Sequence, residues 1–249
     1  MDLGIDGRVA IVTGASRGLG LSTVGALAAE GVKVLAAARS EGKLAELERA
    51  HPGQVVRASY DARDPDAAAT LVARAIEAFG ELDILVNNAG IAPASPFIDD
   101  DMASWRETLE VNVMGPVSLT QAAGVHMLER RSGKVINIAS LTGMRGKARL
   151  SAYSASKGAL IRFTEAVAAE WARHNVQVNA IAPGAFRTEA QQEVLDSEEL
   201  HRRRVARIPA RRFAEPHEMD GLLCFLASPL SDFITGATYA IDGGELAKL

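Results

Sequence analysis

The residues in this sequence best suited to proton transfer are Tyr153 and Lys157, which lie four positions apart. On a helix, this spacing places a phenol and an ammonium on the same face. The positive charge favours the phenolate and is expected to lower the tyrosine pKa from about 10 towards physiological pH. A group tuned in this way acts as a general acid or base, an effect worth roughly 10²–10⁴-fold in rate. The pair therefore predicts an acid–base site, although an exposed helix face with the tyrosine packed on a partner has the same spacing.

Ser140 is the third residue that this chemistry can use. It follows the apolar run at 134–138 and comes before the helical segment that carries Tyr153. Both groups are therefore expected at the carboxyl edge of a sheet, where α/β proteins bind their ligands. The alternative is a hydroxyl that only satisfies a turn at the end of its strand.

A glycine-rich loop joins the first apolar run to the first helical stretch: Thr13-Gly14-Ala15-Ser16-Arg17-Gly18-Leu19-Gly20. Such a loop lets the backbone approach a phosphate, and the helix N-terminus supplies N–H donors and partial positive charge. A tight turn would also need glycines, but a second strand ending near Ala38 follows at the offset typical of dinucleotide sites. We therefore expect nucleotide contacts from Gly14, Ser16, Arg17, Gly18, Leu19 and Gly20.

The end of the second predicted strand distinguishes the two nicotinamide cofactors. A carboxylate there accepts hydrogen bonds from the adenosine ribose and repels a 2′-phosphate. This chain instead has Ala38 followed by Arg39, with Arg17 in the glycine loop. Two guanidinium groups suit a phosphate dianion, although surface arginines are common. The sequence therefore predicts NADP(H) in preference to NAD(H).

Seven short apolar runs must position these groups. They lie at 9–12, 32–35, 55–56, 84–86, 134–138, 176–181 and, more weakly, near Tyr239. Most are continuous rather than alternating, which indicates strands buried on both faces. Helical patterns fill the intervals, as at 67–79 and 155–171, and three aspartates at 99–101 suit a helix start. About seven parallel strands and about six helices predict an α/β fold, a single doubly wound Rossmann-type domain over residues 1–249.

The composition excludes several other classes of protein. The chain has 249 residues, a net charge of −4 and one cysteine, so neither a nucleic-acid partner nor an intrachain disulfide is expected. The sequence also contains neither a long apolar span nor a basic signal-like start. We therefore expect a cytoplasmic protein without a membrane partner.

Taken together, these motifs resemble the short-chain dehydrogenase/reductase family over essentially the whole chain. The resemblance rests on signatures that appear in family order: the glycine loop, Asn87-Asn88-Ala89-Gly90, Asn112, Ser140, Tyr153 with Lys157, Pro183-Gly184-x-x-x-Thr188 and Ile241-Asp242-Gly243-Gly244. It implies a ketone–alcohol oxidoreductase and a homotetramer built through the long helices around Asn112 and Tyr153 and through the C-terminal strand. It implies no metal.

The resemblance also assigns roles. Tyr153 would be the general acid or base and would also contact the cofactor, and Lys157 would lower the pKa of Tyr153 and hold the nicotinamide ribose. Ser140 and Tyr153 would contact the substrate oxygen, and Asn112 would support a proton-relaying water. Further cofactor contacts are implied for Asn88, Ala89 and Gly90 (adenosine ribose), Asp61 and Ala62 (adenine), and Pro183, Gly184, Phe186 and Thr188 (carboxamide). Asp61 could instead be a helix cap.

The substrate is left open. The segment 185–212, the family's substrate lid, contains Arg202-Arg203-Arg204, Arg207, Arg211 and Arg212, and Arg145, Lys147 and Arg149 lie before Tyr153. These charges are either a solvated face or a receptor for an anionic substrate or carrier. The chain is similar both to 3-oxoacyl-[acyl-carrier-protein] reductases, including Glu129-Arg130-Arg131, and to gluconate 5-dehydrogenases, in 183–189. A catalytically silent, cofactor-binding scaffold is the alternative of another class, and the intact Asn112, Ser140, Tyr153 and Lys157 argue against it.

Overall fold

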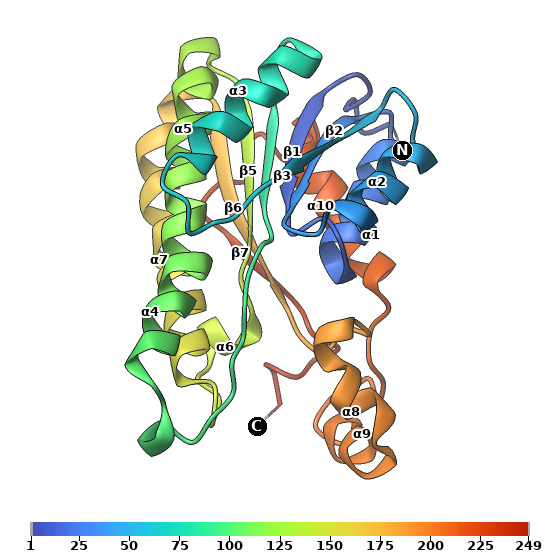
Figure 1. Cartoon of the computed structure of the whole chain (residues 1–249), viewed down its shortest axis with the longest axis vertical. Coiled ribbons are helices and arrows are strands. Elements are labelled where there is room, and N and C mark those ends of the chain that lie inside the picture. The colour runs from blue at the N-terminus through green and yellow to red at the C-terminus, as the bar shows by residue number, and fades with distance from the viewer. Residues whose placement is uncertain (1, 249) are drawn as a thin grey trace.

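Seven parallel strands form the centre of the molecule, in the order β3-β2-β1-β4-β5-β6-β7 (Figure 1). The computed structural model describes residues 2–248, so the first and last residues of the predicted 1–249 domain lie outside it. The strands are β1 (Val9–Thr13), β2 (Lys33–Ala38), β3 (Val55–Ser59), β4 (Ile84–Asn87), β5 (Gly133–Ile138), β6 (Val176–Pro183) and β7 (Thr238–Ile241). Each predicted apolar run coincides with one of them, and the α/β prediction is confirmed.

The strands carry apolar side chains on both faces because each face is covered by helices. In β1, Ala10 and Val12 belong to one core, and Ile11 belongs to the other. Such two-sided burial explains why the runs are continuous in the sequence. The first core is covered by α1 (Gly18–Ala29), α2 (Glu41–Ala50) and α10 (Asp220–Ala227), and the second by α3 (Ala67–Phe79), α5 (Gly115–Arg130) and α7 (Ser151–Trp171).

Two helices matter most for the site. Helix α7 begins at Ser151, four residues before the periodic stretch at 155–171, so Tyr153 lies in its first turn and on the helix predicted to carry it. A short helix, α6 (Leu141–Met144), precedes it. Helix α4 (Met102–Leu109) continues into α5 through a π-helical turn at Glu110–Met114, and Asp101 caps α4 by accepting a hydrogen bond from Ala103 N at 3.0 Å.

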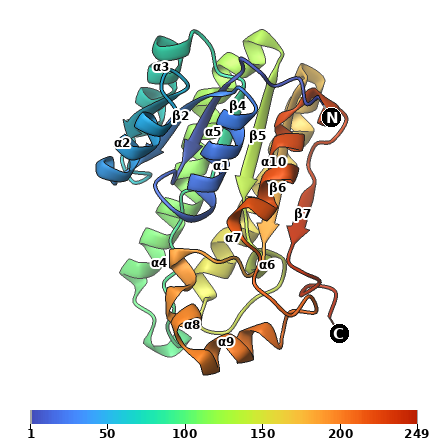
Figure 2. The same cartoon turned by 90° about the vertical axis from the view of Figure 1, so that its right-hand side faces the viewer.

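The segment 185–212 forms α8 (Gln192–Asp196) and α9 (Glu198–Val205) beyond the carboxyl ends of the strands (Figure 2). It has its own small apolar cluster, in which Ala185, Ile208 and Phe213 are buried. With them, residues 2–248 contain ten α-helices, more than the six or so expected. Within residues 2–248, no helix is both long and apolar enough to span a membrane.

Candidate active site

A cavity of about 1390 Å³ opens at the carboxyl edge of the sheet, beside the neighbouring strands β1 and β4. The strands that follow β1 and those that follow β4 lie on opposite sides of this pair in the sheet. This is the place where doubly wound sheets bind ligands. Most of the predicted site residues line it: Gly14, Ser16, Arg17, Gly18, Leu19, Arg39, Asp61, Ala62, Asn88, Ala89, Gly90, Ser140, Tyr153, Lys157, Pro183, Gly184, Phe186 and Thr188. The other two, Gly20 and Asn112, lie behind the cavity wall and support it.

The glycine loop is packed so tightly that side chains are excluded from two positions. Gly14 has a φ of +65°, and a Cβ there would lie 2.8 Å from Asn88 Nδ2. A Cβ on Gly20 would lie 2.3 Å from the carbonyl oxygen of Gly14. The loop ends in α1, whose N-cap residue Arg17 makes no side-chain capping hydrogen bond. The first N–H groups of α1 are therefore available to an anion.

Thr13 is a site residue that the sequence analysis did not identify. Its Oγ1 accepts hydrogen bonds from Asn88 N at 3.0 Å and Ala89 N at 3.1 Å, and Asn88 Nδ2 donates to Thr13 O at 2.9 Å. These bonds hold the ends of β1 and β4 together below the loop. The Thr-Gly pair that opens the loop was the available signal.

Arg17 and Arg39 are both exposed and both line the cavity, and no ion pair to either occurs among residues 2–248. The neighbouring Asp61 is held by Arg63, whose Nη2 lies 2.6 Å from Asp61 Oδ2. Hydrogen bonds from Arg63 lower the pKa of Asp61 to about 2, and the charge of Arg39 acts in the same direction. Asp61 also accepts from Arg63 N at 3.0 Å, so it forms a local turn as well as part of the cavity wall.

Ser140 and Tyr153 meet at the centre of the cavity. Ser140 follows β5 and caps α6, with its Oγ accepting a hydrogen bond from Thr142 N at 3.2 Å. The predicted turn role and the proximity to the tyrosine are therefore both present. A hydrogen bond with Ser140 lowers the pKa of Tyr153, but burial has the larger effect and raises it.

Lys157 lies one turn beyond Tyr153, as the spacing predicts, and is 4% exposed. Its Nζ lies 5.8 Å from the centre of the Tyr153 ring and donates to Ile138 O at 2.7 Å. Burial lowers the pKa of Lys157 to about 8. The net pKa shift of Tyr153 is therefore opposite to the one predicted, because desolvation of the phenol dominates in this structure.

Asn112 sits in the π-helical turn between α4 and α5 and is fully buried. Its Nδ2 donates to Ile91 O and Ser156 Oγ, and its Oδ1 accepts from Ile91 N. A Cβ on Gly90 would lie 3.2 Å from Asn112 Oδ1 and 3.5 Å from Lys157 Nζ, so the amide also borders the lysine. A π-turn at this position is typical of functional sites.

The segment after β6 forms a further wall of the cavity. Gly184 N donates to Ile241 O at 2.8 Å, and a Cβ on Gly184 would lie 2.8 Å from the Asp242 Cα. Phe186 is 3% exposed, and Thr188 lies against the phosphate loop, 3.3 Å from where a Gly18 Cβ would be. The predicted contact segment at 183–188 is thus brought to the glycine loop.

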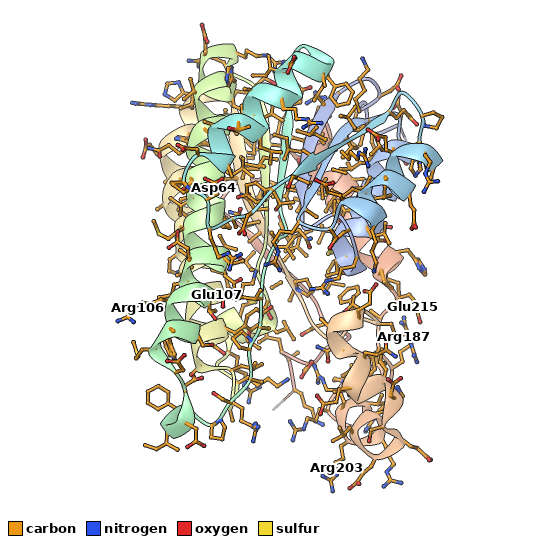
Figure 3. The ribbon with its side chains drawn as sticks, viewed as in Figure 1. Asp64, Arg106, Glu107, Arg187, Arg203 and Glu215 are labelled. Carbon is orange, nitrogen blue, oxygen red and sulfur yellow. The ribbon has the colours of Figure 1, made fainter. Side chains whose placement is uncertain are left out.

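The arginine-rich region divides into two groups. Four members are exposed and do not line the cavity: Arg202, Arg203 paired with Glu199 (Figure 3), Arg212 paired with Glu218, and Arg211, which donates to the carbonyl of Ala206. Five line the cavity, namely Arg145, Lys147, Arg149, Arg204 and Arg207. The solvated-face interpretation fits the first group, and the receptor interpretation stays a prediction for the second. Among residues 2–248, no three His, Cys, Asp or Glu side chains come close enough to hold a metal.

Comparisons with known proteins agree with this geometry. The sequence model of the short chain dehydrogenase family matches residues 8–199. The 2-dehydro-3-deoxy-D-gluconate 5-dehydrogenase of Escherichia coli (strain K12) is 36% identical, over 98% of this chain and 97% of that protein. The 3-oxoacyl-[acyl-carrier-protein] reductase of Synechocystis sp. (strain ATCC 27184 / PCC 6803 / Kazusa) is also 36% identical, over 95% and 96%. A gluconate 5-dehydrogenase from Burkholderia cenocepacia J2315, solved with NADP and tartrate, superposes with a TM-score of 0.95 at 33% identity, covering 100% of this chain and 98% of that one.

Proposed function

Because the chain belongs to the short-chain dehydrogenase/reductase family, we propose that this oxidoreductase transfers a hydride between NADP(H) and a ketone or secondary alcohol, with Tyr153 as acid and base. The observation that carries the proposal is the convergence of Ser140, Tyr153 and Lys157 in the cavity that begins at the glycine loop. Tyr153 would supply the proton, Ser140 would polarise the substrate oxygen, and Lys157 would set the charge around them.

The residues present suit a dinucleotide. The backbone of the tightly packed loop at Gly14 and Gly20 and the uncapped start of α1 would hold the pyrophosphate. Asn88–Gly90 would contact the adenosine ribose, Asp61 and Ala62 the adenine, and Pro183, Gly184, Phe186 and Thr188 the carboxamide. When bound, the nicotinamide gives or takes the hydride, and the protein supplies orientation and the proton.

The preference for NADP(H) rests on Arg17 and Arg39. The end of β2 carries Ala38 rather than a carboxylate, and both arginines line the cavity. A 2′-phosphate beside them would form charge-assisted hydrogen bonds, each worth about 1.5–3 kcal/mol. NAD(H) lacks that phosphate and would gain nothing from either arginine.

In the reducing direction, Tyr153 gives its proton to the carbonyl oxygen while Ser140 donates a hydrogen bond to the same oxygen. Burial raises the pKa of Tyr153, so the phenol keeps its proton at neutral pH and is in the form that an acid needs. Lys157, held by Ile138 O, would keep a positive charge near the phenolate that forms and contact the nicotinamide ribose. Asn112 positions the backbone beside Lys157, where a relaying water would bind. In the oxidising direction the same proton returns to Tyr153.

Two substrate classes compete, and one observation separates them. A carrier-protein substrate would use a basic residue near Arg130, as in the 3-oxoacyl reductases. Here Arg130 is engaged by Glu81 at 2.6 Å and by the 6% exposed Asp83 at 2.9 Å, which itself accepts from Val9 N. Arg130 therefore stabilises the fold, and we favour a small sugar acid over an acyl thioester.

The test is oxidation of NADPH and of NADH with 5-keto-D-gluconate and with the neutral acetoacetyl thioester of N-acetylcysteamine. We expect turnover of at least one of them, with kcat/KM for NADPH at least tenfold above that for NADH. Tight NADPH binding without turnover of either compound would favour a silent scaffold. Turnover of the thioester alone would favour the acyl reductase.

The proposal includes the assembly, the lid and the compartment. Several apolar side chains are exposed where a homotetramer of this family would pack, among them Val125 on α5 (65% exposed) and Phe233 before β7 (103%). Light scattering should give about four times 26.3 kDa.

The segment 185–212 would act as the substrate lid. The enzyme would work in the cytoplasm, which fractionation of the source cells would test.

A further inference from the structure

We propose that Lys147, Arg204 and Arg207 form a receptor for the carboxylate of a polyhydroxy-acid substrate, at the end of the cavity next to the catalytic tyrosine. This inference rests on the proposed function. It assigns the residues that recognise one end of the substrate, the end remote from the reacting carbon. It predicts that the enzyme distinguishes an acid from the otherwise identical neutral polyol.

The three cations come from two segments, distant in sequence, that the fold brings to one place. Lys147 lies in the loop between α6 and α7, Arg204 lies on α9, and Arg207 follows α9. All three line the same cavity as Tyr153. The backbone N–H of Lys147 donates to Ser154 Oγ at 3.3 Å, so the lysine is attached to the helical turn that carries the tyrosine.

Arg204 is held in place before any ligand arrives. Its two terminal nitrogens lie 2.6 and 2.7 Å from the two carboxylate oxygens of Glu245, in a paired geometry. The two side chains are only 16% and 24% exposed. Lys248 Nζ also donates to Ala206 O at 3.2 Å, which ties the end of the chain to the same segment. Such an arrangement reduces the entropy lost when an anion binds.

The positive charges at this end of the cavity are not balanced. Three cations share one carboxylate, and no ion pair to Lys147 or Arg207 occurs among residues 2–248. Lys147 is still reached by water, yet burial lowers its pKa, and the charges of Arg204 and Arg207 lower it further against the opposing effect of Glu245. Arg145 and Arg149 line the same wall and add charge of the same sign. A bound anion would relieve this repulsion.

A small carboxylate suits this receptor better than a carrier protein. The cations share a cavity with the catalytic residues, so one small molecule can present its anion to them and its reacting carbon to Tyr153. Relatives are named for acids of this kind, such as the 5-keto-D-gluconate 5-reductase of Escherichia coli (strain K12), which is 34% identical. Arg130, a basic residue that a carrier protein could use, is instead paired with Glu81 and Asp83 of this chain.

The test compares D-gluconate with D-glucitol, which differ only in a carboxylate replaced by CH₂OH. Their dissociation constants are measured with NADP⁺ present, by protection of the protein against thermal unfolding, so the readout does not depend on turnover. We expect wild type to bind D-gluconate at least tenfold more tightly than D-glucitol. Lys147→Gln and Arg207→Gln should each weaken D-gluconate binding about tenfold and leave D-glucitol binding unchanged.

Arg203→Gln is the matched control, because Arg203 lies on the same helix as Arg204 but points outward to Glu199 (Figure 3). It should bind both compounds as wild type does. Equal affinity of wild type for the two compounds, binding of neither, or an equal loss in Arg203→Gln would overturn the receptor.

Failure of the receptor can be told apart from failure of the proposed function. The neutral thioester of N-acetylcysteamine is assayed with NADPH in every variant. If wild type turns over the thioester and both variants retain this turnover but selectively lose D-gluconate binding, the result supports both the receptor and the proposed function. Turnover without discrimination between D-gluconate and D-glucitol overturns the receptor alone, and no oxidation of NADPH with any carbonyl overturns the function as well.

Discussion

The side-chain amide of Asn112 pairs with the backbone of Ile91 in the manner of a neighbouring strand. Asn112 Oδ1 accepts from Ile91 N at 2.9 Å, and Nδ2 donates to Ile91 O at 2.8 Å. Nδ2 also donates to Ser156 Oγ at 3.0 Å, and Ser156 Oγ donates to Tyr153 O at 2.8 Å. One buried amide therefore joins the segment after β4 to the helix that carries Tyr153 and Lys157.

Replacing Asn112 with alanine should impair both stability and turnover. The substitution leaves the peptide groups of Ile91 without their partners, and a buried polar group without a hydrogen bond costs about 1–3 kcal/mol. Displacement of α7 relative to Ile91 should lower kcat roughly 10- to 100-fold. Denaturant unfolding and steady-state kinetics measure the two effects. Ser156→Ala removes only one of the bonds and should have a smaller effect, and equal effects would contradict this account of Asn112.

Two glycines on α1 should respond in opposite ways to substitution by alanine. In Gly20→Ala the new Cβ would lie 2.3 Å from Gly14 O, so the phosphate loop must move, and the affinity for NADPH should fall more than tenfold. In Gly25→Ala the Cβ meets no atom within 4 Å, so alanine should raise the free energy of unfolding by about 0.5–1 kcal/mol. Fluorescence titration and thermal unfolding test the pair. Unchanged NADPH binding in Gly20→Ala would show that the loop does not hold the pyrophosphate.

Arg39→Ala should weaken the binding of NADPH and leave that of NADH unchanged. Loss of a charge-assisted hydrogen bond of about 1.5–3 kcal/mol corresponds to a Kd roughly 10- to 100-fold higher. Arg49→Ala is the control, since Arg49 lies on α2 and its Nε donates to Ala45 O. Equal changes for the two cofactors in Arg39→Ala would mean that Arg39 does not contact the 2′-phosphate.

The stability of the protein should contain a pH-dependent contribution from Lys157. Burial lowers its pKa from 10.5 to about 8, so between these values the unfolded chain binds a proton that the folded protein lacks. The free energy of unfolding contributed by Lys157 therefore rises as the pH increases from about 8 to 10.5, by about 3 kcal/mol in total.

Lys157→Met should remove that rise. Cys224 and Tyr60 have pKa values raised by burial to about 12, which lowers stability as the pH increases, but this effect is common to both proteins. The difference between wild type and variant therefore isolates Lys157. Urea unfolding at several pH values between 7 and 10.5 gives this difference, and a difference that does not change with pH would contradict the assigned pKa.

The sequence predicted the strands well because each is a continuous apolar run buried on both faces, as Ile11 and Val12 show. It also predicted the residues around the cavity, since strand ends in a doubly wound sheet meet at one edge. It did not predict the π-turn at Asn112, because the side chain of Asn112 bonds to partners distant in sequence. The predicted lowering of the Tyr153 pKa was wrong, because burial raises this pKa and burial is a property of the fold and not of the Tyr–Lys spacing.

The pairing of Arg204 with Glu245 illustrates the same limit on the substrate side. The sequence shows a run of three arginines, but nothing local distinguishes Arg204 from Arg203. Only the path of the C-terminal segment brings Glu245 to Arg204, while Arg203 meets Glu199 on its own helix. The division between recognition and solvation is therefore a result of tertiary structure.

The most direct test of the account is Tyr153→Phe, which removes one hydroxyl and leaves the ring in place. NADPH binding by fluorescence titration should be unchanged within a factor of about three, since Tyr153 is only one of many residues assigned to the cofactor. The rate of NADPH oxidation with the carbonyl substrate that wild type turns over should fall roughly 10²–10⁴-fold. Oxidation at the wild-type rate by a folded Tyr153→Phe protein would contradict the assignment of Tyr153 as the proton donor.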